Sequence, residues 1–222
     1  MQDLSWINDT SVEIWHDSLP TLNSQELLTY LDILYETEIT WRKNDTVEFS
    51  VIYPVDKMDY KTDGTVFERP SVRGIIIKDG KILMIHSLKY DYYKLPGGGI
   101  EKGESYEEAL IREVSEESGY ILKPDSIREF GYVRRISKGM IEDIFIQDNY
   151  YFVCETDEAK ASQNLDDYEA DELFTPEFVT AEHAIKTNKT ADHKEKALSR
   201  TFETMIEREN RVLEIIKKEL MV

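Results

Sequence analysis

The most informative segment of the chain covers residues 95–120 and reads LPGGGIEKGESYEEALIREVSEESGY. Three adjacent glycines give its first part a backbone freedom that other residues lack. Its second part predicts a helix over residues 105–118, because Ser105 and Glu108 have the spacing of a capping box and Gly119 suits the position just past a helix end. The segment is therefore expected to be a glycine-rich loop that leads into a helix.

Three glutamates, Glu113, Glu116 and Glu117, share one face of the predicted helix near its C-terminal end. This is the negative end of the helix dipole, where each carboxylate costs about 0.3–1 kcal/mol. A local rule broken in this way often marks a functional site. Because Mg²⁺ binds a few carboxylates and completes its sphere with water and substrate phosphates, the pattern indicates a Mg²⁺ site. The alternative is a solvated acidic helix face.

The spacing over residues 98–120 is G-x5-E-x7-R-E-V-x-E-E-x-G-Y. It resembles the Nudix box, G-x5-E-x7-R-E-U-x-E-E-x-G-U, in which U is a bulky aliphatic residue. All seven Gly, Glu and Arg positions match, and Val114 matches the first U. Tyr120 departs from the second U, since it is bulky but not aliphatic. This departure concerns packing at the helix end rather than the charged positions.

The resemblance implies an α/β fold, the Nudix-type α/β/α sandwich around a mixed sheet. It also implies a metal-dependent pyrophosphohydrolase that uses Mg²⁺ or Mn²⁺. Such an enzyme cleaves the diphosphate linkage of a nucleoside diphosphate-X type small molecule by attack of water on phosphorus. The alternatives are a catalytically silent sensor or regulator on the same fold, and a protein-interaction module. Sensors of this kind often lose box glutamates, and all of them are present here.

Residue roles follow from the resemblance at the matching positions. Glu116 and Glu117 would be the main metal ligands, and Glu113 would be a further ligand or would activate water. Glu104 would support the metal site, and Arg112 would hold the glutamates in orientation.

Two further groups are candidate substrate contacts. One is the loop of Gly97, Gly98 and Gly99, in which the carbonyl of Gly97 is also a candidate metal ligand. The other is Arg134 and Arg135, which follow a predicted strand and could bind a substrate phosphate, a solvated strand end being the alternative.

The general base of some Nudix proteins lies outside the box, in a loop before the next helix. The corresponding acidic loop here covers residues 155–172, and Asp167 is our candidate base. Ordinary solvation is the alternative for each carboxylate of this loop, which are Glu158, Asp166, Asp167, Glu169, Asp171 and Glu172.

The net charge of −18, from 45 acidic and 27 basic side chains, disfavours binding to nucleic-acid polymers and anionic membranes. An anionic substrate therefore needs a local cation. Residues 1–6 lack the start of a signal peptide, and no apolar run approaches the ~20 residues of a membrane span. We expect a cytoplasmic protein that acts on a phosphorylated small molecule. The signatures of particular Nudix substrates are not evident, so the substrate is not readable.

The sequence divides into three regions that differ in composition and pattern. Residues 1–65 form an N-terminal extension or small accessory domain, residues 66–190 form the Nudix domain, and residues 191–222 form a C-terminal helix that packs on the core or at a homodimer interface.

Expected elements are helices over 24–38, 181–186 and 192–220, the last capped by Asp192, and strands over 47–53 (ended by Pro54), 127–136 and 144–154. Strands 72–78 and 81–88 should form a hairpin at Asp79-Gly80. The lone cysteine, Cys154, is expected to be a buried, inert thiol.

Overall fold

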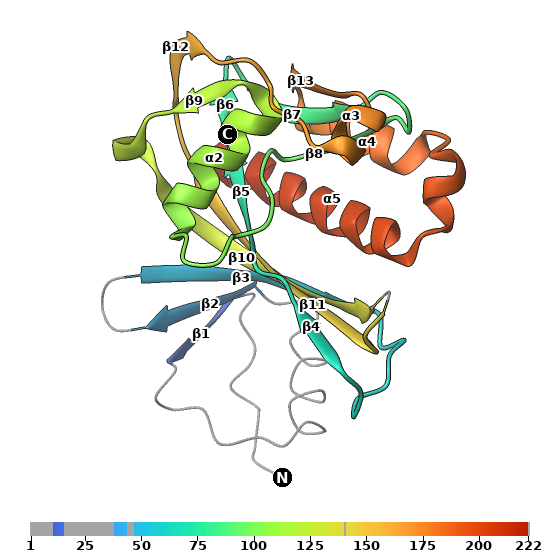
Figure 1. The fold of residues 1–222 in the computed structure, drawn as a ribbon. Coiled ribbons are helices and arrows are strands. Elements are labelled where there is room, and N and C mark those ends of the chain that lie inside the picture. The colour runs from blue at the N-terminus through green and yellow to red at the C-terminus, as the bar shows by residue number, and fades with distance from the viewer. Residues whose placement is uncertain (1–10, 16–37, 44–46, 140, 222) are drawn as a thin grey trace.

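The computed structural model describes residues 11–15, 38–43, 47–139 and 141–221. Within these ranges seven strands form a mixed sheet in the order β1, β2, β3, β10, β11, β4, with β5 also paired to β11 (Figure 1). The β2–β3 and β10–β11 pairs are antiparallel and the others are parallel. The strands are β1 (Ser11–Trp15), β2 (Glu38–Lys43), β3 (Val47–Asp56), β4 (Val66–Glu68), β5 (Ser71–Ile75), β10 (Arg128–Lys138) and β11 (Ile144–Val153).

A second sheet joins four strands, with β7 paired to β13, β6 and β8, and β9 pairs with β12 beside it. These strands are β6 (Ile77–Lys78), β7 (Lys81–Ser87), β8 (Tyr92–Lys94), β9 (Tyr120–Leu122), β12 (Thr156–Lys160) and β13 (Phe174–Val179).

The chain passes from one sheet to the other at Ile76. The expected hairpin exists only at its turn, where Lys78 pairs with Lys81, and Asp79 and Gly80 both have positive φ as a type I′ turn requires. Residues 71–75 instead pair in parallel with β11. Because β5 is buried along its whole length, it can pair in parallel with β11 rather than continue the hairpin.

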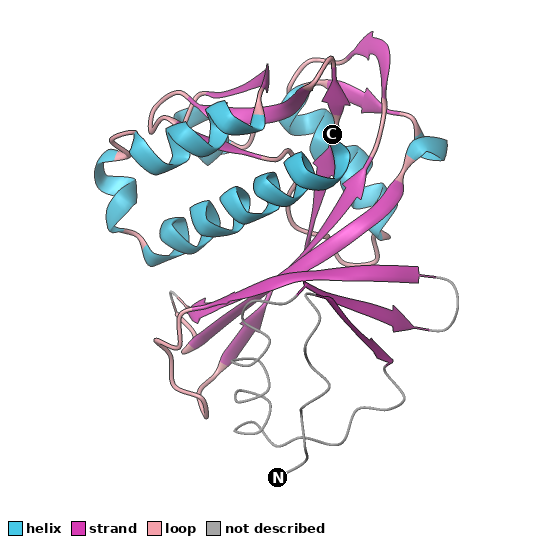
Figure 2. Ribbon diagram, turned by 180° about the vertical axis from the view of Figure 1, so that it is seen from behind, coloured by secondary structure: helices cyan, strands magenta, loops and turns pink. Residues whose placement is uncertain are grey.

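Helices cover both sides of the sheets, which confirms the expected α/β sandwich. Alternate residues of the strands face opposite sides, so Val72 and Ile76 pack towards α2 (Tyr106–Ser118), whereas Ile75 packs towards α4 (Ala181–Thr190) and α5 (Arg200–Leu220). Seen from behind, α4 and α5 lie side by side (Figure 2).

Strand β3 continues past Pro54 to Asp56, beyond its expected end. Its register with β10 shifts between Val133, which pairs with Ile52, and Arg135, which pairs with Val55. Proline lacks an amide proton and is tolerated in a strand at such an irregularity. The expected strands 127–136 and 144–154 are present as β10 and β11, with bounds that differ by one or two residues.

The expected helix over 192–220 begins later than predicted. A 3₁₀ helix, Lys194–Leu198, comes first, and α5 starts at Arg200 with Ser199 as its N-cap. Lys194 has a φ of 53°, so a continuous α-helix cannot run through it from Asp192. Leu198, which the prediction placed inside this helix, lies before α5 and is 89% exposed.

Helix α4 and the acidic loop contain more regular structure than the sequence predicted. Helix α4 runs four residues beyond its expected end, and the acidic loop holds β12 and the short helix α3 (Asp167–Asp171). Cys154 is buried, and burial raises its pKa to about 12. The helix expected over 24–38 lies outside the described residues, apart from Glu38, which begins β2. No helix of the described ranges is long and apolar enough to cross a membrane.

We expect Leu213→Ala to lower the free energy of unfolding by about 2–5 kcal/mol, since Leu213 is fully buried in the core between α5 and the sheets. Leu220→Ala, at a 38% exposed position of the same helix, should cost less than about 1 kcal/mol. Urea unfolding of both variants checks this. Equal, small losses would mean that α5 does not stabilise its own domain.

Candidate active site

The helix of the box, α2, has both of its ends defined by local hydrogen bonds. The backbone N–H of Glu108 donates to the Ser105 hydroxyl at 3.2 Å, and the N–H of Ser105 donates to the Glu108 carboxylate at 2.9 Å. Gly119 ends the helix in the left-handed conformation, with φ of 71°. The expected capping box and C-terminal glycine are thus confirmed, and they fix where α2 begins and ends.

The glycine loop lies between strand β5 and the glutamate face of α2. The N–H of Val72 donates to the carbonyl of Gly98 at 3.0 Å. A Cβ at Gly97, whose φ is 137°, would lie 2.1 Å from the Val72 carbonyl oxygen, and one at Gly98 would lie 2.2 Å from Oε2 of Glu113. At Gly97 the clash is with backbone, so glycine is required there, whereas a side chain at Gly98 would have to displace the Glu113 carboxylate.

Arg112 connects the glutamates of the site with the glycine loop. Its guanidinium donates to both oxygens of Glu104 at 2.7 and 2.8 Å, to Glu113 at 2.8 Å and to Glu116 at 3.2 Å. It also donates to the carbonyl of Gly99 at 3.1 Å. The pairing with Arg112 holds the pKa of Glu104 at about 2. Arg112 thus lies where it can orient the glutamates and tie the loop to the helix.

Glu117 points away from Glu113 and Glu116. Its side chain is 1% exposed; Oε1 is 2.5 Å from Nζ of Lys94 and Oε2 accepts from the N–H of Gly97 at 2.9 Å. Lys94 is itself buried and lies over the ring of Phe174 at 4.5 Å. The sequence did not single out Lys94, because a lone lysine at a strand end carries no signal.

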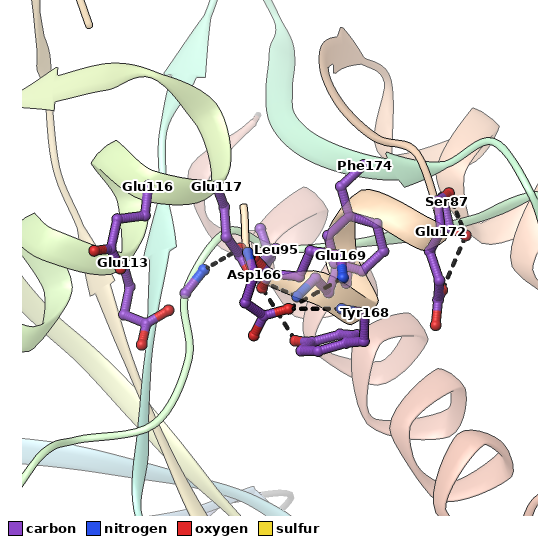
Figure 3. Close-up of polar contacts among 12 residues, drawn as sticks. Ser87, Leu95, Glu113, Glu116, Glu117, Asp166, Tyr168, Glu169, Glu172 and Phe174 are labelled. Atoms are coloured by element: carbon purple, nitrogen blue, oxygen red, sulfur yellow. Dashed lines mark hydrogen bonds and ion pairs between the residues drawn. The ribbon is translucent and has the colours of Figure 1, made fainter. Parts of the chain in front are cut away.

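A cavity of about 370 Å³ opens beside this face of α2. Figure 3 shows Glu113 and Glu116 descending from α2 on one side, with Asp166 and Glu169 on the other. The complete lining is Arg69, Gly99, Ile100, Glu101, Arg112, Glu113, Glu116, Asn164, Leu165, Asp166 and Glu169.

The acidic segment reaches the cavity through Asp166 and Glu169, not through Asp167. Asp166 accepts from the N–H of Glu169 at 3.1 Å, and Glu169 accepts from the N–H of Asp166 at 3.1 Å, so the two form the capping box of α3. Asp167 is the exposed first residue of this helix. Burial and the nearby Glu117 raise the pKa of Glu169.

Arg134 and Arg135, the expected phosphate ligands, are not among the residues that line this cavity. Successive residues of a strand point to opposite faces, so the two cannot act together. Arg134 makes a two-point pair with Asp148 at 2.8 Å, and Arg135 is buried and donates to the carbonyl of Thr201. Burial and the nearby Arg208 and Arg73 lower the pKa of Arg135 to about 9.

The donor atoms on the cavity wall suit a hard divalent cation, since they are carboxylate oxygens beside a backbone carbonyl. In the described ranges no three His, Cys, Asp or Glu side chains converge as a ready metal cluster. The glutamates pair instead with Arg112 and Lys94, which balance their negative charge within the protein. The chemistry of this donor set therefore fits a divalent metal.

A glycine loop, a capped helix and an arginine-centred cluster of glutamates together define a Nudix-type site. A family model described as NUDIX domain matches residues 68–201, which is more than half of the chain. The chain belongs to the Nudix family, whose members generally use divalent metal ions.

Several curated proteins are similar over part of their length. An ADP-ribose pyrophosphatase of Methanocaldococcus jannaschii is 47% identical over 60 residues, which cover 26% of this chain and 36% of that protein. An RNA pyrophosphohydrolase of Baumannia cicadellinicola is 35% identical over 88 residues, covering 39% and 54%. The matches thus span about a third to a half of these relatives. The solved MutT protein of Bacillus halodurans is 18% identical, with a TM-score of 0.44, over 54% of this chain and 72% of that one.

Replacing Glu104 with Gln should destabilise the protein by on the order of 1–3 kcal/mol at neutral pH, solvent screening included. The pKa of Glu104 is lowered on folding, from 4.5 to about 2, so its contribution is present above about pH 5. That contribution disappears as pH falls towards 2, and the variant and wild type should converge there.

Urea unfolding of both proteins between pH 7 and pH 2.5 measures this difference. Glu107→Gln, at an exposed position of the same helix, is the control and should have little effect. A loss of stability for Glu104→Gln that did not change with pH would contradict the assigned pairing with Arg112.

Proposed function

We propose that this chain is a metal-dependent pyrophosphohydrolase that cleaves a diphosphate linkage in a nucleoside diphosphate-X type small molecule. The observation that carries the proposal is the arrangement of the box. Glu113 and Glu116 form one wall of a cavity large enough for phosphate groups, while Arg112 fixes both. The similarity to proteins named as ADP-ribose and RNA pyrophosphohydrolases supports the reaction class. The net charge of −18 favours a small substrate over a polymer.

Mg²⁺ or Mn²⁺ would be held by Glu113, Glu116, Glu117 and the carbonyl of Gly97, and Glu117 would have to give up its ion pair with Lys94 to join them. When bound, such an ion neutralises phosphate charge and acidifies a coordinated water. Among the protein's own groups, Arg112 positions Glu113 and Glu116. The Gly97 N–H donates a hydrogen bond to Glu117 and so ties the loop to α2. This contact restrains the backbone that carries the Gly97 carbonyl, which is the fourth proposed metal ligand.

Glu169 is the general base of this proposal, in place of Asp167, because it lines the cavity opposite the box glutamates. The oxygen of a water attacks phosphorus while its proton passes to the Glu169 carboxylate. The bond between phosphorus and the bridging oxygen breaks, and the bridging oxygen leaves with the second phosphate group. The capping box with Asp166 holds Glu169 in place during this transfer.

We also propose a cytoplasmic location, and activity without a membrane or nucleic-acid polymer as partner. The strongly acidic composition disfavours both kinds of anionic surface.

Chromatographic assays of the cleavage products of nucleotide sugars, dinucleotides and nucleoside triphosphates should detect turnover only with Mg²⁺ or Mn²⁺. Glu113→Gln should reduce turnover at least 100-fold and weaken Mg²⁺ uptake in calorimetry, because the ion loses a charged ligand; roughly this loss is typical of removing a catalytic group. Glu107→Gln, outside the cavity, should match wild type. Absence of both turnover and metal uptake in wild type would instead favour a silent sensor.

Glu169→Gln should lower kcat by about 10²–10⁴-fold with a smaller change in KM, as expected for loss of a general base. Asp167→Asn removes the same charge two residues away, at an exposed site, and should change kcat less than threefold or so. Steady-state kinetics of the two variants compare them directly. A larger loss of kcat for Asp167→Asn than for Glu169→Gln would instead identify Asp167 as the general base.

A further inference from the structure

Arg69 is the one lining residue of the cavity, among those described, whose positive charge is not already used within the protein. The wall holds five carboxylates and two guanidinium groups. The guanidinium of Arg112 is committed to three glutamates and the Gly99 carbonyl. Arg69, in contrast, is exposed, and its side chain makes no hydrogen bond or ion pair with any residue that the structure describes.

The backbone around Arg69 is held firmly beside the glycine loop. The N–H of Arg69 donates to the carbonyl of Ile146 in β11 at 3.0 Å, and the carbonyl of Pro70 accepts from the N–H of Ile100 at 3.2 Å. Ser71 forms a bridge with Gly99. The chain on both sides of Arg69 is therefore anchored, and only the side chain is free to adjust.

Gly99 makes room for the Arg69 guanidinium. A Cβ at Gly99 would lie 2.9 Å from Nε and 3.0 Å from Nη2 of Arg69. The missing side chain thus allows the guanidinium to lie on the loop, in the lining of the cavity that also includes Asp166 and Glu169.

A diphosphate that enters this cavity meets an acidic wall on a protein of net charge −18. A metal ion at the glutamates neutralises part of this repulsion, but the phosphate oxygens that face away from them need another donor. A guanidinium suits this role, because its planar fork can donate two parallel hydrogen bonds to one phosphate group.

We propose that Arg69 binds a phosphate group of the substrate and is the specificity residue that selects diphosphate compounds at this site. This inference rests on the proposed function. It assigns to Arg69 the part that the sequence had suggested for Arg134 and Arg135.

The test compares Arg69→Gln, Arg69→Lys and Arg128→Gln in the full chain. The probe is methylenediphosphonate, a diphosphate mimic that cannot be hydrolysed, titrated calorimetrically with and without Mg²⁺. Arg69→Gln should weaken binding roughly 10- to 100-fold, since a charge-assisted pair is lost. Arg69→Lys, which keeps the charge without the fork, should fall between. Arg128→Gln changes net charge equally at an exposed position outside the cavity, and should bind within about twofold of wild type.

With a hydrolysed substrate, Arg69→Gln should raise KM by a similar factor and leave kcat within about threefold. Binding by Arg69→Gln equal to that of wild type, or no binding of the probe to wild type, would overturn the inference. If wild type binds the probe through Arg69 but hydrolyses no substrate, the hydrolase proposal fails and the assignment of Arg69 stands. If wild type is active and Arg69→Gln has an unchanged KM, the assignment alone fails.

Discussion

The interaction on which the site depends is the attachment of one guanidinium, that of Arg112, to three glutamates and a backbone carbonyl. Glu104, Glu113 and Glu116 would repel one another if they were drawn together without it. The same group reaches Gly99, so it joins helix α2 to the glycine loop as well. A single side chain therefore balances the charge of three glutamates and also contributes to holding the loop.

A second constraint is the confinement of the glycine loop. Strand β5 holds it on one side through Val72, and α2 holds it on the other through Glu117. Helix α5 adds a third attachment, because the carboxylate of the buried Glu209 accepts from the N–H of Leu95 at 3.0 Å. A loop rich in glycine would otherwise sample many conformations. Here its flexibility is removed by contacts with three separate elements.

Sequence reasoning succeeded where a feature is local. The capping box of Ser105 and Glu108 and the turn at Asp79-Gly80 involve residues a few positions apart, and both are present in the structure. The prediction from sequence was wrong where two residues could each cap the same helix. Asp192 and Ser199 are both acceptable N-caps, and the positive φ of Lys194, which depends on the surrounding packing, selects Ser199. The strand expected over 72–78 is likewise divided between two sheets.

The sequence by itself determined that Glu113 and Glu116 lie together, because residues three apart on one helix share a face, whereas their proposed roles come from the resemblance to the Nudix box. Only the tertiary structure decided what surrounds them. It brings Arg69, Lys94 and Glu169 to the site from strand ends and the short helix α3, and it sends Arg134 and Arg135 to opposite faces of β10. Pairing between distant strands and the alternation along each strand control these placements, and neither is written in the spacing of nearby residues.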